Sequence, residues 1–138
     1  MFGPWGNGGG YDMEKKRIKI KSGEVEINAE LNDCKIAGLI WDSLPLKASV
    51  NTWGDEIYFT IPVKAEIDNP VEVVKEGDIG YWPQGCAFCI FFGPTPVSSP
   101  TEIRPASAVE IIGKVEGDPK RFSEVASGGT IVIEKEED

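Results

Sequence analysis

The chain has 138 residues, a net charge of −9 and no histidine. Its length suits one domain with its own hydrophobic core, and its hydrophobic fraction of 41% and charged fraction of 27% are typical of globular proteins. The acidic charge argues against nucleic acid and anionic membranes as partners, because both attract a basic surface. The lack of histidine excludes Ser-His and Cys-His nucleophiles and the usual zinc and iron ligand sets, so we expect no metal and no cofactor.

No segment of the sequence is typical of export or of membrane insertion. It contains no run of about eighteen apolar residues, and its N-terminus lacks the basic and apolar regions of a secretion signal. The cysteines Cys34, Cys86 and Cys89 are odd in number and have spacings that predict no disulfide framework. We therefore expect a reduced, cytoplasmic location. The sequence leaves the number of subunits open.

The two ends of the sequence differ in composition from the part between them. Residues 1–15 are rich in glycine and predict a flexible leader, although its aromatic residues could dock it onto a surface. Residues 136–138 are acidic and predict a solvated tail. Residues 16–135 form the predicted folded domain.

The predicted domain begins with a hairpin and a helix. Apolar and polar residues alternate over 17–31 on either side of a Ser-Gly turn, so we expect two antiparallel strands with one buried face. Asp33 is expected to cap a helix that starts near Cys34, because apolar residues then recur at spacings of three and four. Pro45 is expected to end this helix.

The rest of the domain is predicted to consist of short strands between turn residues, with one more short helix. The expected strands are 47–53, 56–61, 71–74, 79–82, 86–92, 109–115 and 130–134, and the expected helix is 119–125. The strand at 86–92 is apolar on both faces, so other parts of the chain must cover each side. We therefore predict a mainly β fold, a closed antiparallel barrel of roughly eight strands with two short helices.

The order of these elements and several strings of residues resemble a known fold. A hairpin, a helix, several strands, a short helix and a final strand follow one another in the cyclophilin order. The strings at 53–59 (WGDEIYF), 77–83 (GDIGYWP) and 91–96 (FFGPTP), with Leu44-Pro45 at the helix end, resemble a small prokaryotic cyclophilin-like family of unknown function. The resemblance covers about residues 17–134. It implies a cyclophilin-like barrel and brings no settled activity.

The resemblance raises prolyl isomerisation as an activity. Cyclophilins use an arginine that hydrogen-bonds the substrate, while an apolar groove holds the proline ring. If the topologies match, this arginine would fall within residues 50–52, which read Val-Asn-Thr. Only Arg104, in a proline-rich loop, could reach a groove. The alternative to simple binding is therefore a weak peptidyl-prolyl cis-trans isomerase without the usual catalytic arginine.

Aromatic residues on several predicted strands are candidates for a ligand groove. Tyr58 lies on the strand face opposite Ile57 and Phe59, which is the outside of a filled barrel. Aromatic side chains with a few polar groups suit a peptide or small-molecule ligand, whereas the alternative is that they only pack beneath a loop or the leader. The candidate groove residues are Trp53, Glu56, Tyr58, Thr60, Tyr81, Trp82, Phe91, Phe92, Thr95 and Arg104. The sequence leaves open which face of the 86–92 strand points to the groove.

Two adjacent carboxylates and a CxxC pattern are further candidates for catalytic or metal-binding residues. Asp55 and Glu56 are neighbours, so on a strand they point to opposite faces and cannot act as a pair. Asp55 is expected to be a turn residue, and Glu56 to accept a hydrogen bond from an N–H group of a ligand. Cys86 and Cys89 would also face opposite ways on a strand, so we expect them to be core residues.

The segment 93–108 is longer than most connections and contains four prolines. Because proline stiffens a loop, we expect either a fixed wall of the groove or a strap that seals the barrel. Hydrogen-bonding groups that a wall could offer to a ligand belong to Thr95, Ser98, Ser99 and Arg104.

The sequence favours a barrel that binds a peptide or a small molecule in a surface groove without covalent chemistry. No nucleophile-base pair or cofactor fingerprint can be assembled from its residues, which argues against a hydrolase or an oxidoreductase. Two alternatives remain beside simple binding. One is the weak isomerase, and the other is a chaperone-like module that contacts another protein through the aromatic residues and the leader.

Overall fold

The computed structural model describes residues 16–136, so the predicted leader and residues 137–138 lie outside the described residues. The alternating sequence at the start of this part forms a hairpin of β1 (Lys16–Ser22) and β2 (Val25–Leu31). Apolar side chains of both strands, such as Ile18 and Ile27, are buried on one face. The predicted hairpin is therefore confirmed.

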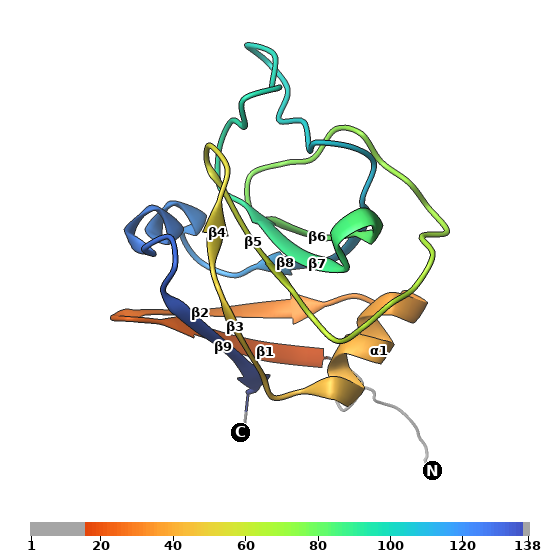
Figure 1. Cartoon of the computed structure of the whole chain (residues 1–138), viewed down its shortest axis with the longest axis vertical. Coiled ribbons are helices and arrows are strands. Elements are labelled where there is room, and N and C mark those ends of the chain that lie inside the picture. Colours follow the sequence, from red (N-terminus) through yellow and green to blue (C-terminus); the bar gives the residue numbers. More distant parts are fainter. Residues whose placement is uncertain (1–15, 137–138) are drawn as a thin grey trace.

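Nine antiparallel strands make up the sheet, in the order β3-β9-β1-β2-β8-β6-β7-β5-β4 (Figure 1). The strands after the hairpin are β3 (Leu46–Ser49), β4 (Asn51–Thr52), β5 (Glu56–Thr60), β6 (Asp78–Trp82), β7 (Ala87–Phe91), β8 (Glu110–Val115) and β9 (Thr130–Lys135). The predicted mainly β barrel is confirmed, with nine strands where the sequence indicated roughly eight. It is nearly closed.

The barrel is closed by one bent strand that belongs to both edges of the sheet. β3 and β4 stand at opposite ends of the strand order but are separated in the chain by Val50 alone. β3 pairs with β9, and β4 pairs with β5. At the bend, the Val50 N–H donates to the Gly129 carbonyl (2.9 Å) and the Val50 carbonyl accepts from the Gly128 N–H (2.7 Å). Both edges of the sheet therefore meet at this strand.

The helix α1 (Lys35–Ser43) packs at the lower end of the barrel in Figure 1. It buries Ile36, Ala37 and Ile40, which join the main core, and it ends before the cis peptide bond at Leu44-Pro45. Its cap is Cys34, whose Sγ accepts from the Ala37 N–H at 3.4 Å, so the predicted cap at Asp33 was wrong. The physical reason is that the Asn32 N–H still donates to the Ile112 carbonyl of the sheet, so helical hydrogen bonding begins later, at the Cys34 carbonyl.

Two short 3-10 helices complete the helical elements of residues 16–136. The first, η2 (Pro83–Gly85), was not predicted and connects β6 to β7. The second, η3 (Pro119–Glu124), lies within the helix predicted at 119–125 and is capped by the Asp118 side chain. Within residues 16–136, no helix combines the length and the apolar character needed to cross a bilayer.

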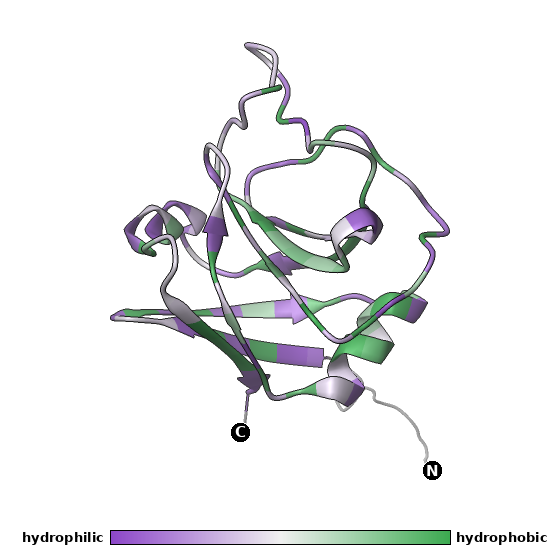
Figure 2. Cartoon of the chain, in the orientation of Figure 1, coloured by the Kyte–Doolittle hydropathy of each residue, from purple (hydrophilic) through white to green (hydrophobic). Residues whose placement is uncertain are grey.

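Strand β7 is buried on both faces and divides the apolar interior into two layers. It is hydrophobic along its whole length (Figure 2). Its inward side chains, Phe88 and Ile90, belong to the barrel core. Its outward side chains belong to a second group, which we call the outer cluster. The buried members of the outer cluster are Val74, Ala87, Cys89, Phe91 and Val109.

The outer cluster is covered by the chain segments 71–74 and 103–109. We predicted a strand at 71–74, but this segment makes only two isolated bridges, Val71 to Val109 and Val74 to Ile103. Each of β6, β7 and β8 is already paired on both sides within the barrel, so none of these three strands has a free edge for another strand. The segment therefore packs over the sheet as an outer layer.

The turn between β4 and β5 is locked to the start of the 93–108 segment. The Asp55 N–H donates to the Pro94 carbonyl, and the Phe92 N–H donates to the Asp55 carbonyl, both at 2.9 Å. Gly54 has a φ of +59°, and a Cβ there would lie 2.9 Å from the Thr95 Cα. Asp55 therefore lies in a turn, as predicted, and the WGDEIYF and FFGPTP strings pack against each other.

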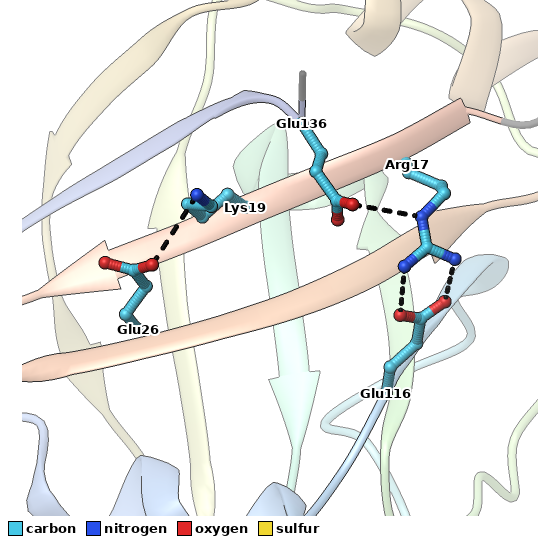
Figure 3. Close-up of polar contacts among 5 residues, drawn as sticks. All are labelled: Arg17, Lys19, Glu26, Glu116 and Glu136. Atoms are coloured by element: carbon cyan, nitrogen blue, oxygen red, sulfur yellow. Dashed lines mark hydrogen bonds and ion pairs between the residues drawn. The ribbon is translucent and has the colours of Figure 1, made fainter. Parts of the chain in front are cut away.

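Ion pairs join β1 of the hairpin to two residues from the later part of the chain (Figure 3). The Arg17 guanidinium binds both carboxylate oxygens of Glu116 at 2.8 Å, and its Nε lies 3.4 Å from Glu136. These two carboxylates raise the pKa of Arg17. The Glu136 N–H also donates to the Arg17 carbonyl at 2.9 Å. Glu136, which the sequence assigned to the solvated tail, is thus attached to the barrel.

We predict that Gly54→Ala lowers the free energy of unfolding by roughly 2–4 kcal/mol, since a left-handed backbone and a close neighbour both oppose a Cβ. Gly23→Ala is the matched control, because Gly23 has a φ of +60° and no atom within 4 Å of the added Cβ. Its expected cost is only about 1–2 kcal/mol. Denaturant unfolding of both variants measures the difference. Equal losses would contradict the proposed contact with residues 94–96.

Candidate functional site

A pocket of about 210 Å³ opens on the outer face of the sheet, beside the outer cluster. It is formed by the turn before β5, by β5 itself, by the end of β6, by β7 and by the segment that leads into β8. We call it the aromatic pocket. Its lining residues are Trp53, Glu56, Tyr58, Trp82, Cys89, Pro105, Ala106 and Val109.

Strand alternation and strand pairing explain why four of these side chains meet. Glu56 and Tyr58 are two residues apart on β5, so both project from the outer face. Trp53 faces Glu56 across the β4–β5 turn, with backbone hydrogen bonds of 2.9 and 3.2 Å between them. Tyr58 is paired with Cys89 of β7. Side chains of directly paired residues lie on the same face of a sheet.

The aromatic walls of the pocket are held in place. The Trp82 Nε1–H donates to the Ser107 hydroxyl at 2.6 Å, which ties β6 to the segment before β8. The rings of Tyr58 and Trp82 have centroids 6.4 Å apart and planes at 79°. Trp53, Tyr58 and Trp82 are half-buried, so each can still be reached from solvent. The pocket therefore presents fixed aromatic surfaces that meet nearly at right angles.

Glu56 supplies a carboxyl group to this apolar pocket. The residue is only 5% exposed, and within residues 16–136 its carboxyl makes no ion pair and has the weakly donating Cys89 thiol as its hydrogen-bond partner. Burial raises the pKa of Glu56 to about 7, and the hydrogen bond from the Cys89 thiol opposes this rise. Burial and the neighbouring Glu56 raise the pKa of the Cys89 thiol. Near neutral pH the Glu56 carboxyl thus exists in both protonation states, and the thiol stays neutral.

Six of the ten predicted groove residues lie outside the aromatic pocket, two of them because their side chains point inward and one because it is fully buried. Tyr81 points into the barrel, where its hydroxyl donates to the Val63 carbonyl at 2.7 Å. Phe92 also points inward and packs 6.5 Å from Phe122, between ring centroids. Phe91 does face outward, but it is fully buried in the outer cluster.

The side chains of the other three make hydrogen bonds or ion pairs elsewhere in the structure. Thr60 shares the outer face of β5 but lies at its far end, where its hydroxyl donates to the Gly85 carbonyl at 3.2 Å. Thr95 is buried, and its hydroxyl donates to the Arg104 carbonyl. The Arg104 guanidinium pairs with Glu102 at 2.7 Å. These side chains of the 93–104 part of the loop therefore interact with other residues of the same loop.

Four lining residues were not predicted from the sequence: Cys89, Pro105, Ala106 and Val109. Cys89 could have been found once β5 and β7 were known to pair, because it lies opposite Tyr58. The other three come from the segment that folds over the sheet, and no periodic signal predicts that placement. Val109 can approach because residue 80 is glycine, where a Cβ would lie 3.0 Å from Val109 Cγ2.

The cysteine and acidic residues form no further centre. Cys86 lies before β7 in a left-handed conformation (φ 47°), not on the strand as predicted, whereas Cys89 is buried in β7. All three cysteines are free thiols. Among residues 16–136, no three His, Cys, Asp or Glu side chains are grouped closely enough to hold a metal ion.

We predict that Glu56→Gln makes the protein more stable than wild type at alkaline pH and that this advantage disappears in acid. A buried carboxyl with a raised pKa costs nothing below its ordinary pKa of 4.5, and its cost grows until the pH passes about 7. The full difference is on the order of 3 kcal/mol. Unfolding measured between pH 4.5 and 8.5 tests this. A stability difference between the two proteins that does not change with pH would contradict the prediction.

Comparison with known proteins places this fold among relatives. The chain is similar to the solution structure of the hypothetical protein AF2241 from Archaeoglobus fulgidus, with 40% sequence identity and a TM-score of 0.76 over 88% of this chain and 95% of that chain. No curated protein matches the sequence. The family described as cyclophilin-like matches residues 16–134, which confirms the resemblance found in the sequence. The chain therefore belongs to the cyclophilin-like family.

Proposed function

We propose that the protein binds a small molecule, or one side chain of a peptide, in the aromatic pocket without covalent chemistry. The observation that carries this proposal is the combination of aromatic walls with a buried carboxyl whose partner in the described chain is a weakly donating thiol. Ligand sites are typically concave, mostly apolar and furnished with a few placed polar groups. The aromatic pocket has these properties.

Glu56 supports a binding role because, within the described chain, only the weakly donating Cys89 thiol offsets the free-energy cost of burying its carboxyl. Burying an ionisable group without a partner destabilises a fold, so such groups are commonly found where a ligand supplies the partner. A hydrogen-bond donor on the ligand would fill this role.

The lining argues for binding rather than for isomerisation. No arginine lines the aromatic pocket, although an isomerase of the cyclophilin type requires one. Val50 is buried at the barrel closure, Asn51 and Thr52 carry no charge, and Arg104 is paired with Glu102. The weak isomerase therefore stays the second candidate, with only the aromatic walls in its favour.

We expect a proline-containing tetrapeptide or small organic fragments to shift the indole NMR signals of Trp53 and Trp82. The indole of Trp41 is the internal control, because it lies outside the pocket with the Lys135 ammonium 4.7 Å from its ring centroid. Tyr58→Ala should weaken binding by roughly tenfold, since it removes one aromatic wall. Thr60→Ala is the matched control, because Thr60 lies on the same face of β5 but outside the pocket.

Binding that survives Tyr58→Ala unchanged would remove the proposed site. The same titration separates the two candidate functions, because exchange peaks report the cis and trans forms of the peptide. Shifts without faster exchange favour simple binding, whereas faster exchange would favour the isomerase.

A further inference from the structure

We propose that the ligand of the aromatic pocket carries a methylated ammonium head group. This inference rests on the proposed function and specifies the chemistry of the ligand. Three features of the pocket support it: the sign of its charge, its three aromatic side chains and the small number of hydrogen-bond acceptors among its side chains.

The charge of the pocket selects a cation. Among the lining residues that the structure describes, Glu56 is the only aspartate or glutamate, and none is a lysine or an arginine. An anion would therefore meet a buried carboxylate with nothing to offset the repulsion. The net charge of −9 adds a long-range field of the same sign, which attracts cations to the surface.

The aromatic walls suit a cation better than they suit a neutral apolar group alone. Trp53, Tyr58 and Trp82 all line the pocket, and the rings of Tyr58 and Trp82 stand nearly perpendicular to each other. The negative face of an aromatic ring attracts a cation, and tryptophan does so most strongly. Aromatic cages that recognise quaternary ammonium groups use this interaction.

The shortage of acceptors favours a methylated head group over a primary ammonium. A primary ammonium has three N–H donors and is strongly hydrated, so it needs several acceptors in exchange for water. Among the described lining side chains, the acceptors are the Glu56 carboxylate, the Tyr58 hydroxyl and the weakly accepting Cys89 thiol, and the remaining side chains are apolar or donate only. Methyl groups remove this need and contact the apolar walls.

Binding of a cation should also depend on pH. The other titratable side chains that face the Glu56 carboxyl are Tyr58 on β5 and Cys89 on β7, and the Trp53, Trp82 and 105–109 parts of the lining contribute none. The neighbouring Asp55 side chain lies against Gly93 instead. Because burial places the pKa of Glu56 at about 7, a cation that requires the carboxylate form must displace a proton at lower pH. Its affinity should fall toward tenfold per pH unit below 7.

Choline, ethanolamine and 3,3-dimethylbutan-1-ol form a matched series of probes. The second lacks the three methyl groups of choline, and the third replaces the charged nitrogen by carbon and keeps the shape. We expect choline to bind roughly tenfold more tightly than either of the others at pH 8, measured by titration calorimetry and by the Trp53 and Trp82 indole signals. At pH 6 the advantage over the neutral alcohol should fall by roughly tenfold. Glu56→Gln should abolish that advantage.

The outcomes test the methylated ammonium head group separately from the proposed binding function. Equal binding of choline and the neutral alcohol at pH 8 would overturn the cationic head group but leave the proposed binding function intact. Ethanolamine binding as tightly as choline would overturn the requirement for methylation. If the pocket bound neither these probes nor the fragments and peptide described above, the proposed function would fail as well.

The source of the head group is separated by one further arm. A short peptide with a trimethylated lysine presents the same chemistry on a protein side chain, and its unmodified lysine counterpart is the control. Tighter binding of the methylated peptide than of choline would assign the head group to a protein partner. Tighter binding of choline would assign it to a free small molecule.

Discussion

The bent strand formed by β3 and β4 is the constraint on which the rest of this structure depends. Because β3 pairs with β9 and β4 pairs with β5, the sheet curves round on itself into a nearly closed barrel. Two segments that are not barrel strands then lie over its outer face. The segments 71–74 and 103–109 do so, and the second of them supplies a wall of the aromatic pocket.

The pocket is therefore a product of how the barrel is covered. β7 is apolar on its outer face as well as its inner face, which requires a covering layer. The covering segment leaves part of that face open between Trp53, Tyr58 and Trp82. The Trp82–Ser107 hydrogen bond joins barrel and cover at the pocket, so its walls have a defined spacing. A preformed site of this kind loses little entropy when a ligand binds.

Sequence patterns predicted the elements whose residues interact locally and failed where distant segments meet. Alternation over 17–31 and 56–61 was sufficient to find the hairpin and to put Glu56 and Tyr58 on the outer face. The same alternation should have excluded Tyr81, which is adjacent to Trp82 and must point inward when Trp82 points outward. The position of Pro105 and Ala106, in contrast, follows from packing between segments far apart in the chain, and no local propensity encodes it.

The strand order also has a consequence for how the chain must fold during synthesis. β9 lies between β1 and β3, so that Ile18 pairs with Lys135 and Leu46 with Ile133. The hairpin, α1 and β3 are made early, yet the surface they share with β9 stays unpaired until the ribosome has released almost all of the described chain. Non-local pairings of this kind slow folding and expose apolar strands in the meantime. Arg17, Lys19 and Lys21 alternate with the isoleucines of β1, and charges on a strand that is still unpaired discourage pairing with other molecules.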